Sequence, residues 1–393
     1  MMLDVVVVGA GPAGLRSAKL LADAGFDALV LEEHAEVGRP VQCAGLVTPR
    51  VLEMSGGGDF VLNEVTGARF HSPSGKFLDL DGGRAEAVVI DRAGFDRHLA
   101  RQAVDAGAAL ELGAKALDVK VEAGHATIIH TSHGKTAETR ARLVVGADGP
   151  RALVSSKAGL PKPGQFVSGF GVECDGLELD QGRVWIFAGS EVAPGFFAWA
   201  IPAGDRARVG LAVSQGAPHP PKRYLEQLMK RHFGKELAEL EGAEPVAGLV
   251  PLGPVERTAS DRVMTVGDAA GHVKATSGGG IYMGLRCAGH LAETAAKALE
   301  DDDLSGKRLA SYHSAWNDDV GKELKACMRL YKMYSQLSDS ELDAIFDLVN
   351  KPDIIEAIQR TGDIDYPSNV AWEVFKRAPG LVRYTGKLLK GIW

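Results

Sequence analysis

Apolar runs and helix-like spacing alternate over the N-terminal part of the chain. Val5 to Val8 is a continuous β-branched run, typical of a strand buried in a parallel sheet. Leu15 to Ala24 has the spacing of an amphipathic helix, and Gly25 follows it, as glycine often follows helix ends. Ala28 to Leu31 is a second buried run that leads into two glutamates. The pattern predicts a β-α-β unit.

Later segments continue this pattern with one interruption. A helix is expected from Phe95 to Ala106, with apolar positions on one face. Further strands are expected at 126–130, 142–146 and 262–266. Between 164 and 213 the chain changes to short alternating strands, which favours an antiparallel sheet, and from Gly284 onward it is mostly helical. We expect an α/β domain with an inserted sheet and a helical C-terminal region.

Composition narrows the class of protein. The chain has 393 residues, of which 45% are hydrophobic and 24% charged, as in a globular protein with two or three packed units. The formal net charge of -7 argues against a nucleic-acid partner. No apolar run reaches the roughly 20 residues that a membrane-spanning helix needs.

The cysteines and the N-terminus favour a cytoplasmic location. Cys43, Cys174, Cys287 and Cys327 are too far apart in sequence to form a CxxC pair. Isolated thiols suit a reducing compartment. The chain enters its first predicted strand at once, which leaves no room for a signal peptide.

A glycine-rich turn joins the first predicted strand to the first predicted helix. Its residues match G-x-G-x-x-G: Gly9 permits the tight turn, Gly11 admits a pyrophosphate, and Gly14 lets the helix pack closely on the strand. The helix N-terminus then faces the phosphates. Glu32 ends the second strand, where a carboxylate accepts hydrogen bonds from ribose hydroxyls, and Glu33 is the alternative. The unit predicts a dinucleotide site and leaves NAD and FAD both open.

Three further motifs follow in order along the chain. Residues 142–149 (RLVVGADG) and 262–271 (RVMTVGDAAG) each lead from a predicted strand into a Gly/Asp turn, and Arg92 opens an R-x-x-F-D helix start. Together they resemble the fingerprints of the p-hydroxybenzoate-hydroxylase-like flavoprotein superfamily. The resemblance implies FAD, with Asp268 at the ribityl and pyrophosphate region and Arg92 near the cofactor.

Within that superfamily the chain resembles the geranylgeranyl reductase family over nearly its whole length. Residues 38–45 (GRPVQCAG) are similar to its flavin-side segment, and residues 267–281 are similar to its GDAAG…GGGI loop and helix start. The resemblance implies a Rossmann-like three-layer FAD-binding α/β domain with an inserted antiparallel β-sheet substrate domain. We place the discontinuous FAD domain at 1–60, 85–160 and 256–300, the substrate domain at 61–84 and 161–255, and the helical region at 301–393.

The same resemblance and the glycine motif imply a set of cofactor contacts. The expected FAD-binding residues are Gly9, Gly11, Ala13, Gly14, Glu32, Cys43, Ala44, Gly45, Arg92, Ala116, Asp268, Gly280 and Ile281. A helix N-terminus at Gly280 and Ile281 would stabilise an anionic reduced flavin. No metal site is expected.

A proline-bounded strand is the candidate substrate wall. The family's P-x-x-Y-x-W-x-F-P signature corresponds to residues 194–202, where Phe197 replaces the tyrosine and Ile201 the phenylalanine. In a strand Phe197, Trp199 and Ile201 point to one face, which suits an apolar polyprenyl chain. The alternative is a plain sheet core, and loss of the tyrosine hydroxyl weakens any role of this strand as proton donor.

Three single residues in the predicted flavin-side loops need an interpretation of their own. Cys43 is either a small buried apolar residue or the proton donor at the flavin, which would require a suitably tuned thiol. His272 and Lys274 are expected to be surface-exposed loop residues.

The C-terminal segment differs in composition from the rest of the chain. Residues 377–393 carry four cations and no acid in an otherwise acidic protein, and they end at Trp393. The segment favours peripheral contact with the inner face of the membrane, and a packed helix is the alternative.

The implied reaction is reduction of an isolated C=C bond in a polyprenyl (geranylgeranyl) lipid by hydride from reduced FAD, plus a proton from Cys43 or from water held near the flavin. Because the chain has no second GxGxxG, the electron donor is either NAD(P)H bound without a Rossmann unit or reduced ferredoxin. A flavin-dependent monooxygenase or halogenase is the alternative, since residues 197–202 also resemble the halogenase W-x-W-x-I-P signature. An electron-transfer flavoprotein is a third hypothesis.

Overall fold

A parallel sheet forms the centre of the first layered unit. The computed structural model describes residues 2–384 and 386. The sheet has the order β17-β18-β11-β1-β2-β8, and β10 and β9 extend it from β11. Its strands are β1 (Leu3–Val8), β2 (Ala28–Glu32), β8 (Ala109–Leu112), β9 (Ala116–Val121), β10 (Ala126–Ser132), β11 (Lys135–Gly146), β17 (Ala259–Ser260) and β18 (Val263–Thr265). Strand β1 pairs in parallel with both β2 and β11, as its unbroken β-branched run predicts.

The two faces of β1 bury side chains in different layers. Val5 and Val7 pack against helices on one face, and Val6 and Val8 pack against the β9–β10 side on the other. The helices around this core are α1 (Pro12–Asp23), α2 (Pro49–Ser55), α3 (Arg92–Asp105), α4 (Leu153–Lys157), α6 (Ile281–Glu300) and α7 (Gly306–Trp316). Helix α1 starts earlier than the sequence predicts, because Pro12 suits the first turn of a helix.

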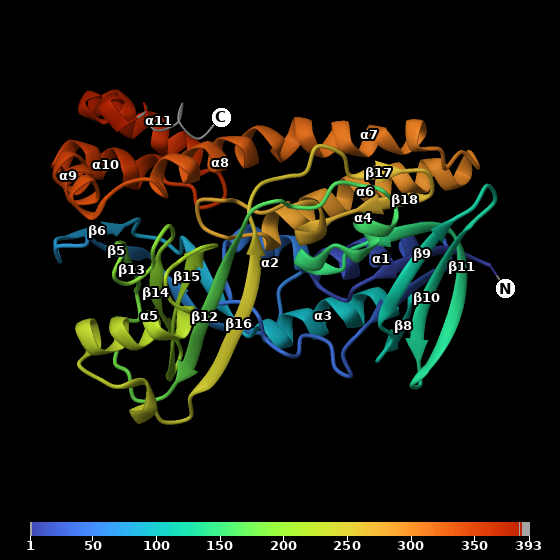
Figure 1. Cartoon of the computed structure of the whole chain (residues 1–393), viewed down its shortest axis with the longest axis horizontal. Helices are drawn as coiled ribbons and strands as arrows, with labels where there is room; N and C mark the ends of the chain where they lie inside the picture. The colour runs from blue at the N-terminus through green and yellow to red at the C-terminus, as the bar shows by residue number, and fades with distance from the viewer. Residues whose placement is uncertain (1, 385, 387–393) are drawn as a thin grey trace.

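A second sheet lies beside the first, at the lower left of Figure 1, in the order β16-β12-β15-β14-β13-β5-β6. Its strands are β5 (Gly67–His71), β6 (Phe77–Asp81), β12 (Phe166–Cys174), β13 (Arg183–Phe187), β14 (Ala198–Ala203), β15 (Arg206–Ser214) and β16 (Glu244–Pro251), and α5 (Pro221–Leu228) covers one face. The sheet is antiparallel except that β5 and β13 pair in parallel. Two short helical turns, η2 (Met229–Phe233) and η3 (Leu237–Glu239), follow α5.

A small third sheet connects the two units. It consists of β3 (Leu46–Val47), β7 (Ala87–Ile90) and β4 (Val61–Val65). Strand β4, which the sequence assigns to the substrate domain, therefore pairs with β7 of the FAD domain. The polypeptide between β3 and β7 thus links the flavin-side segment to the second sheet.

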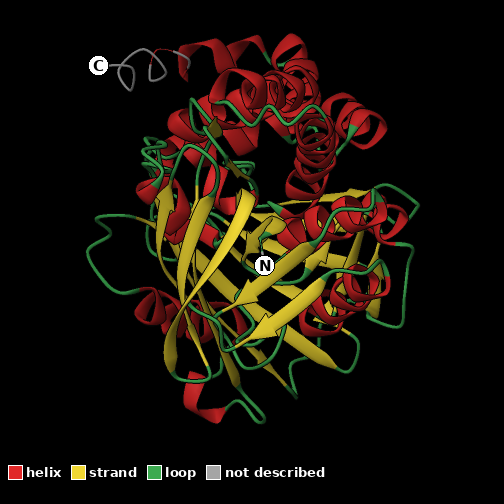
Figure 2. Ribbon diagram, turned by 90° about the vertical axis from the view of Figure 1, so that its right-hand side faces the viewer, coloured by secondary structure: helices red, strands yellow, loops and turns green. Residues whose placement is uncertain are grey.

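Helices after α7 form a separate layer at the top left of Figure 1, and Figure 2 shows them stacked above the strands. They are α8 (Lys322–Tyr334), α9 (Asp339–Val349), α10 (Pro352–Thr361) and α11 (Pro367–Arg377), followed by η6 (Pro379–Leu381). They share an apolar cluster that includes Ile354, Ala378, Leu381 and Tyr384. Across residues 2–384 and 386, every helix is too short or too polar to cross a bilayer.

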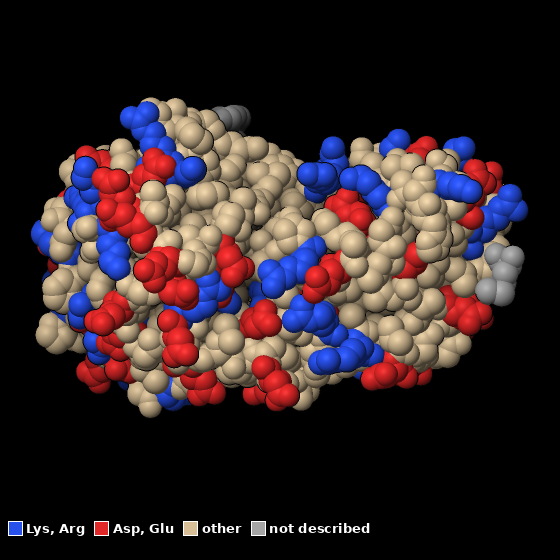
Figure 3. Space-filling view, turned by 90° about the horizontal axis from the view of Figure 1, so that it is seen from below, with Lys and Arg blue, Asp and Glu red and all other residues tan. Residues whose placement is uncertain are grey.

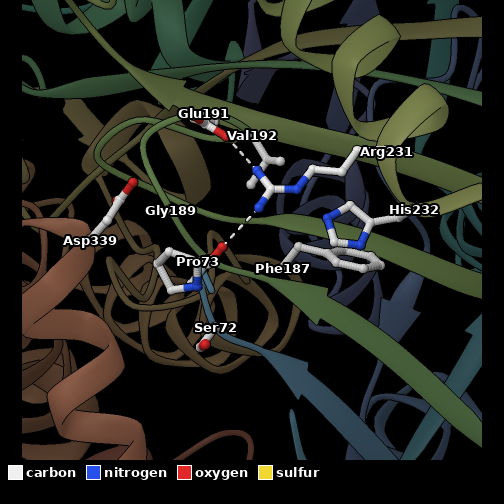
Figure 4. A pocket seen from close by; sticks show the side chains of 10 residues that line it. Ser72, Pro73, Phe187, Gly189, Glu191, Val192, Arg231, His232 and Asp339 are labelled. Carbon is white, nitrogen blue, oxygen red and sulfur yellow. Dashed lines mark hydrogen bonds and ion pairs between the residues drawn. The ribbon is translucent and has the colours of Figure 1, made fainter. Parts of the chain in front are cut away.

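Polar contacts attach this helical layer to the second sheet. At the start of α9, Asp339 accepts hydrogen bonds from the backbone N–H and the hydroxyl of Ser190, both at 2.8 Å. One turn later Asp343 accepts from the Ser72 hydroxyl at 2.6 Å. Figure 4 shows Asp339, Ser72 and Arg231 around the pocket between the two layers, which has a volume of only about 10 Å³. It has room for about one water molecule, which is too little for a nucleotide.

Candidate functional site

The glycine-rich turn has the geometry of a phosphate cradle. Gly9 has a φ of +105°, and a Cβ there would lie 2.3 Å from the carbonyl oxygen of Ala147. A Cβ at Gly14 would lie 2.2 Å from the oxygen of Gly9, so this position also requires glycine. In contrast, a Cβ at Gly11 would meet no atom within 4 Å. The turn is therefore packed at both ends and open in the middle, beside the N-terminus of α1.

Glu32, rather than Glu33, is directed at this turn. One carboxylate oxygen of Glu32 accepts a hydrogen bond from the Ala10 backbone N–H at 2.8 Å, and the other accepts from the His34 N–H at 3.0 Å. Glu32 is 9% exposed. Glu33 instead binds the ammonium of Lys115 at 2.7 Å, and this hydrogen bond lowers the pKa of the Glu33 carboxyl.

Asp268 lies at the other end of the site with an unsatisfied carboxylate. No hydrogen-bond donor reaches its carboxylate from the described residues, and burial raises its pKa to about 6, although the charge of Arg92 acts in the opposite direction. A Cβ at Gly280 would lie 3.1 Å from Asp268 Oδ1, and a Cβ at Gly267 would lie 3.0 Å from the Cβ of Ala13. A partly buried carboxylate without a donor among the described residues, beside two closely packed glycines, fits a hydroxyl-rich ligand such as the ribityl chain of FAD.

The long helix α6 begins beside Asp268. Gly280 is its N-cap and Ile281 its first residue, and no side chain caps its first N–H groups. These groups and the helix dipole are therefore available to an electron-rich acceptor. The open turn at Gly11, the carboxylates of Glu32 and Asp268 and this helix N-terminus together fit the phosphates, sugar chain and ring of FAD.

Arg92 and Cys43 meet at the start of α3. Arg92 donates to the Asp96 carboxylate at 2.8 Å and 3.2 Å, and both side chains are largely buried. Burial alone would lower the pKa of Arg92, but the interactions with Asp96 and with the Cys43 thiol raise it. Cys43 is partly exposed, and its Sγ accepts from the backbone N–H of Gly45 at 3.3 Å. The thiol thus lies beside a fixed cation.

Arg208 fastens the Cys43 segment to the second sheet, a role that the sequence did not reveal. Its Nη1 donates to the oxygens of Ala44 at 3.0 Å and Ile90 at 2.8 Å, and its Nε donates to Glu173 at 2.6 Å. A Cβ at Gly45 would lie 2.3 Å from the same Nη1, which explains the glycine there. The only signal in the sequence is a charged residue within an apolar strand, and its partners depend on the register of β12 and β15.

The candidate substrate wall lies next to Ala44. Phe197 and Trp199 are partly exposed, with ring centroids 6.0 Å apart, whereas Ile201 is 2% exposed. Trp199 of β14 packs with Phe197, which directly precedes the strand, and also against the cluster that contains Ile201, so it joins the two. Because Ala44 packs into the same cluster, the apolar surface continues to the Cys43 segment.

The expectation that His272 and Lys274 are exposed is wrong. His272 is 0% exposed, and its ring lies 4.7 Å from that of Trp316; Lys274 is 3% exposed, because Ile364 and Asp365 of the C-terminal region cover it. Burial lowers the pKa of His272 to about 3, so its ring is neutral at physiological pH. Sequence spacing carries no information about this cover, since the covering segment lies about ninety positions further along the chain.

Two further predictions concern Ala116 and the C-terminal segment. Ala116 begins β9, and two residues before it the N–H of Ala114 donates to the backbone oxygen of Glu32 at 2.7 Å. In the C-terminal segment, residues 385 and 387–393, including Trp393, lie outside the described part of the chain.

Comparison with known proteins agrees with this geometry. The FAD binding domain family matches residues 2–322. Digeranylgeranylglycerophospholipid reductase 2 of Methanopyrus kandleri is 34% identical over 99% of this chain and 100% of its own length. A solved Thermoplasma acidophilum protein, described as geranylgeranyl bacteriochlorophyll reductase-like, is 25% identical with a TM-score of 0.86, covering 98% of this chain and 99% of its own.

A flavin-dependent brominase shares the fold alone, at 17% identity and a TM-score of 0.73 over 98% of this chain and all of its own. The resemblance stated from the sequence motifs is therefore confirmed at the level of the family. The chain is an FAD-binding oxidoreductase that belongs to the geranylgeranyl reductase family.

Proposed function

We propose that this protein reduces carbon–carbon double bonds of a geranylgeranyl lipid. The observation that carries the proposal is the continuity of an apolar wall, Phe197 and Trp199, with Ala44, whose neighbour Cys43 lies beside Arg92. A polyprenyl chain offers no polar group for recognition, so such a wall suits it. Two proteins named for geranylgeranyl substrates align with this chain over nearly its full length, which supports the same substrate class.

The residues proposed to bind FAD lie at two ends of the site. The turn around Gly11 and the carboxylate of Glu32 hold the ADP half of FAD, and Asp268 and the N-terminus of α6 receive the ribityl and ring half. Reduced FAD held by these residues would supply the hydride for one carbon of the double bond. Phe197 and Trp199 exclude water and align the lipid chain, because an isolated alkene reacts only when it is held in place.

Cys43 is the proposed proton donor. Its thiol proton goes to the second carbon of the double bond, and the thiolate that remains is stabilised by the guanidinium of Arg92 before water returns the proton. Phe197 has no hydroxyl, so the strand supplies no acid at that position. The salt bridge to Asp96 holds Arg92 in place for this role.

The C-terminal layer is the proposed contact with the membrane. Trp372 of α11 is 64% exposed and Val382 after η6 is 61% exposed, and the ammonium of Lys376 lies 5.4 Å from the centroid of the Trp372 ring. Tryptophan and lysine together are typical of the bilayer interface. In contrast, acidic and basic side chains are interspersed on the face shown in Figure 3.

An anaerobic turnover experiment tests the reaction. Protein reconstituted with FAD is reduced with dithionite and given a digeranylgeranyl glycerophospholipid in detergent. The proposal expects flavin reoxidation coupled to a lipid mass increase of two hydrogens for each double bond. Unchanged lipid, or an oxygenated or halogenated product on admission of air, would contradict it in favour of an oxygen-using flavoprotein. Repeating the reduction with NADPH and with reduced ferredoxin, in place of dithionite, identifies the physiological class of donor.

A further inference from the structure

Segments far apart in the sequence meet at the carboxylate of Asp365, which is 1% exposed. Its Oδ1 accepts a hydrogen bond from the ammonium of Lys274 at 2.9 Å. Its Oδ2 accepts from the hydroxyl of Thr48 at 2.5 Å and from Arg50 at 3.3 Å. The Lys274 ammonium also donates to the backbone oxygen of Ile364 at 2.7 Å. The result is a buried ion pair whose charged atoms are hydrogen-bonded on both sides.

Lys274 also shapes the turn that leads into α6. Its backbone oxygen accepts from the N–H of Gly278 at 2.8 Å, and its own N–H donates to the oxygen of Gly279 at 3.2 Å. A Cβ at Gly279 would lie 3.1 Å from Cε of the Lys274 side chain, so that side chain runs directly alongside the turn. The Lys274 side chain therefore supports the turn that directly precedes Gly280, the N-cap of α6.

The same carboxylate reaches the flavin-side segment. Thr48 and Arg50 lie at the start of α2, a few residues after Gly45. Arg50 makes a paired contact with Asp363, at 2.7 Å and 2.9 Å. Residues 363–365 of the C-terminal layer therefore hold both segments that surround the proposed flavin ring.

A buried ion pair contributes little net stability, since two packed apolar side chains of similar size usually stabilise a fold as well or better. What it does provide is a defined position, because each donor and acceptor has a preferred direction and distance. We propose that Lys274 and Asp365 are positioning residues that set the N-terminus of α6 against FAD and couple the seating of α10 and α11 to FAD binding. This inference rests on the proposed placement of FAD at Gly280 and Ile281.

Coupling of this kind is reciprocal. If the seated C-terminal layer favours FAD binding, then FAD must favour the seated layer by the same factor. Amide hydrogen exchange in α10 and α11 is therefore expected to slow when FAD is added to the apoprotein, although neither helix contains a proposed FAD-binding residue. An unchanged exchange rate in both helices would contradict the coupling.

Matched variants separate positioning from stability. Lys274→Met and the double variant Lys274→Met/Asp365→Leu are compared with Lys76→Met, which removes the exposed Lys76–Asp347 pair between the same layer and the second sheet. The double variant removes both buried charges and is expected to recover the melting temperature that the single variant loses. Its FAD dissociation constant is nevertheless expected to rise about tenfold or more, the change expected when a hydrogen-bonding group is displaced.

The midpoint potential of bound FAD provides a second readout. It is expected to become more negative in the double variant, because the N-terminus of α6 no longer stabilises the reduced, anionic flavin as well. Lys76→Met is expected to leave both quantities unchanged. Wild-type affinity and potential in the double variant would overturn the inference and leave the pair with a structural role only.

A further variant distinguishes failure of this inference from failure of the proposed site. Gly280→Val places a side chain against Val273 and Asp268 at the N-terminus of α6. Unchanged FAD affinity in Gly280→Val would show that the cofactor lies elsewhere. Weakened affinity in Gly280→Val, together with unchanged affinity in the Lys274 variants, would contradict the positioning role alone.

Discussion

The carboxylate of Glu32 accepts a hydrogen bond from the backbone N–H of Ala10 at 2.8 Å, across 22 positions of sequence. This contact joins the end of β2 to the glycine-rich turn after β1. It directs the Glu32 carboxylate toward the cradle around Gly11, whereas the adjacent Glu33 is directed at Lys115. Neighbouring glutamates therefore have different roles, and each role can be tested.

Replacing Glu32 should weaken FAD binding. Glu32→Gln removes a charged acceptor, and loss of such charge-assisted hydrogen bonds is worth about 1.5–3 kcal/mol, or roughly 10- to 100-fold in the dissociation constant. Glu33→Gln, which loses only a surface contact, should bind FAD as the wild type does. Titration of the apoproteins with FAD, followed by flavin fluorescence, measures both. Equal effects of the two substitutions would contradict the assignment of Glu32.

Asp268 should make the apoprotein less stable as the pH rises. Burial raises the pKa of its carboxyl from 3.8 to about 6 in the folded protein. The folded state therefore holds the proton more tightly than the unfolded state, and stability falls as the pH rises from about 4 to above 6, by up to about 3 kcal/mol. Asp268→Asn should be more stable than wild type at pH 7 without FAD and equal to it near pH 4.

The same substitution should weaken FAD binding, since the carboxylate is lost as an acceptor. Urea unfolding at the two pH values and FAD titration measure the two effects. A pH-independent stability difference between Asp268→Asn and wild type would show that the carboxyl is not strained by burial.

Cys43 should carry the proton-transfer step. Cys43→Ala is expected to lower kcat by about 100- to 10,000-fold, the range for loss of a general acid. FAD binding should change little. Cys174→Ala, at a buried thiol of β12, is the matched control and should retain kcat. A Cys43→Ala enzyme with wild-type kcat would assign the proton to water or to another group.

The position of Trp199 can be changed without altering its side chain. A Cβ at Gly210 of β15 would lie 2.7 Å from the Trp199 ring, so Gly210→Ala must displace the indole. We expect the KM for the lipid to rise about tenfold, equivalent to about 1.4 kcal/mol of lost contact. Gly169→Ala, on the next strand, meets only ordinary contacts at 3.5 Å and 3.8 Å and should leave KM unchanged.

Trp372 should contribute to membrane binding. Trp372→Ala is expected to reduce co-sedimentation with vesicles that contain anionic lipid, because an interfacial tryptophan is lost. Leu117→Ala is the control, since Leu117 is 40% exposed on β9, at the edge of the first sheet and not beside the helical layer. Equal loss of binding in both variants, or none in either, would contradict a specific contact through α11.

Local pattern was sufficient for the β-α-β unit and for the order of the motifs. The unbroken run of Val5 to Val8 is typical of a parallel-sheet strand buried on both faces, and Gly9 and Gly14 admit no side chain. The choice between Glu32 and Glu33 needed the structure, because strand direction near its end decides which carboxylate reaches the turn.

The sequence by itself determined the fold class, the FAD motif and the family, because these depend on residue types at short, regular spacing. Tertiary structure alone decided which distant groups share one environment. Arg208 reaches Ala44 through the register of paired strands, and Lys274 is buried because Asp365 returns to it from the C-terminal layer. Such contacts depend on how the layers pack. Contacts between residues far apart in the sequence produce no regular spacing of residue types along the chain.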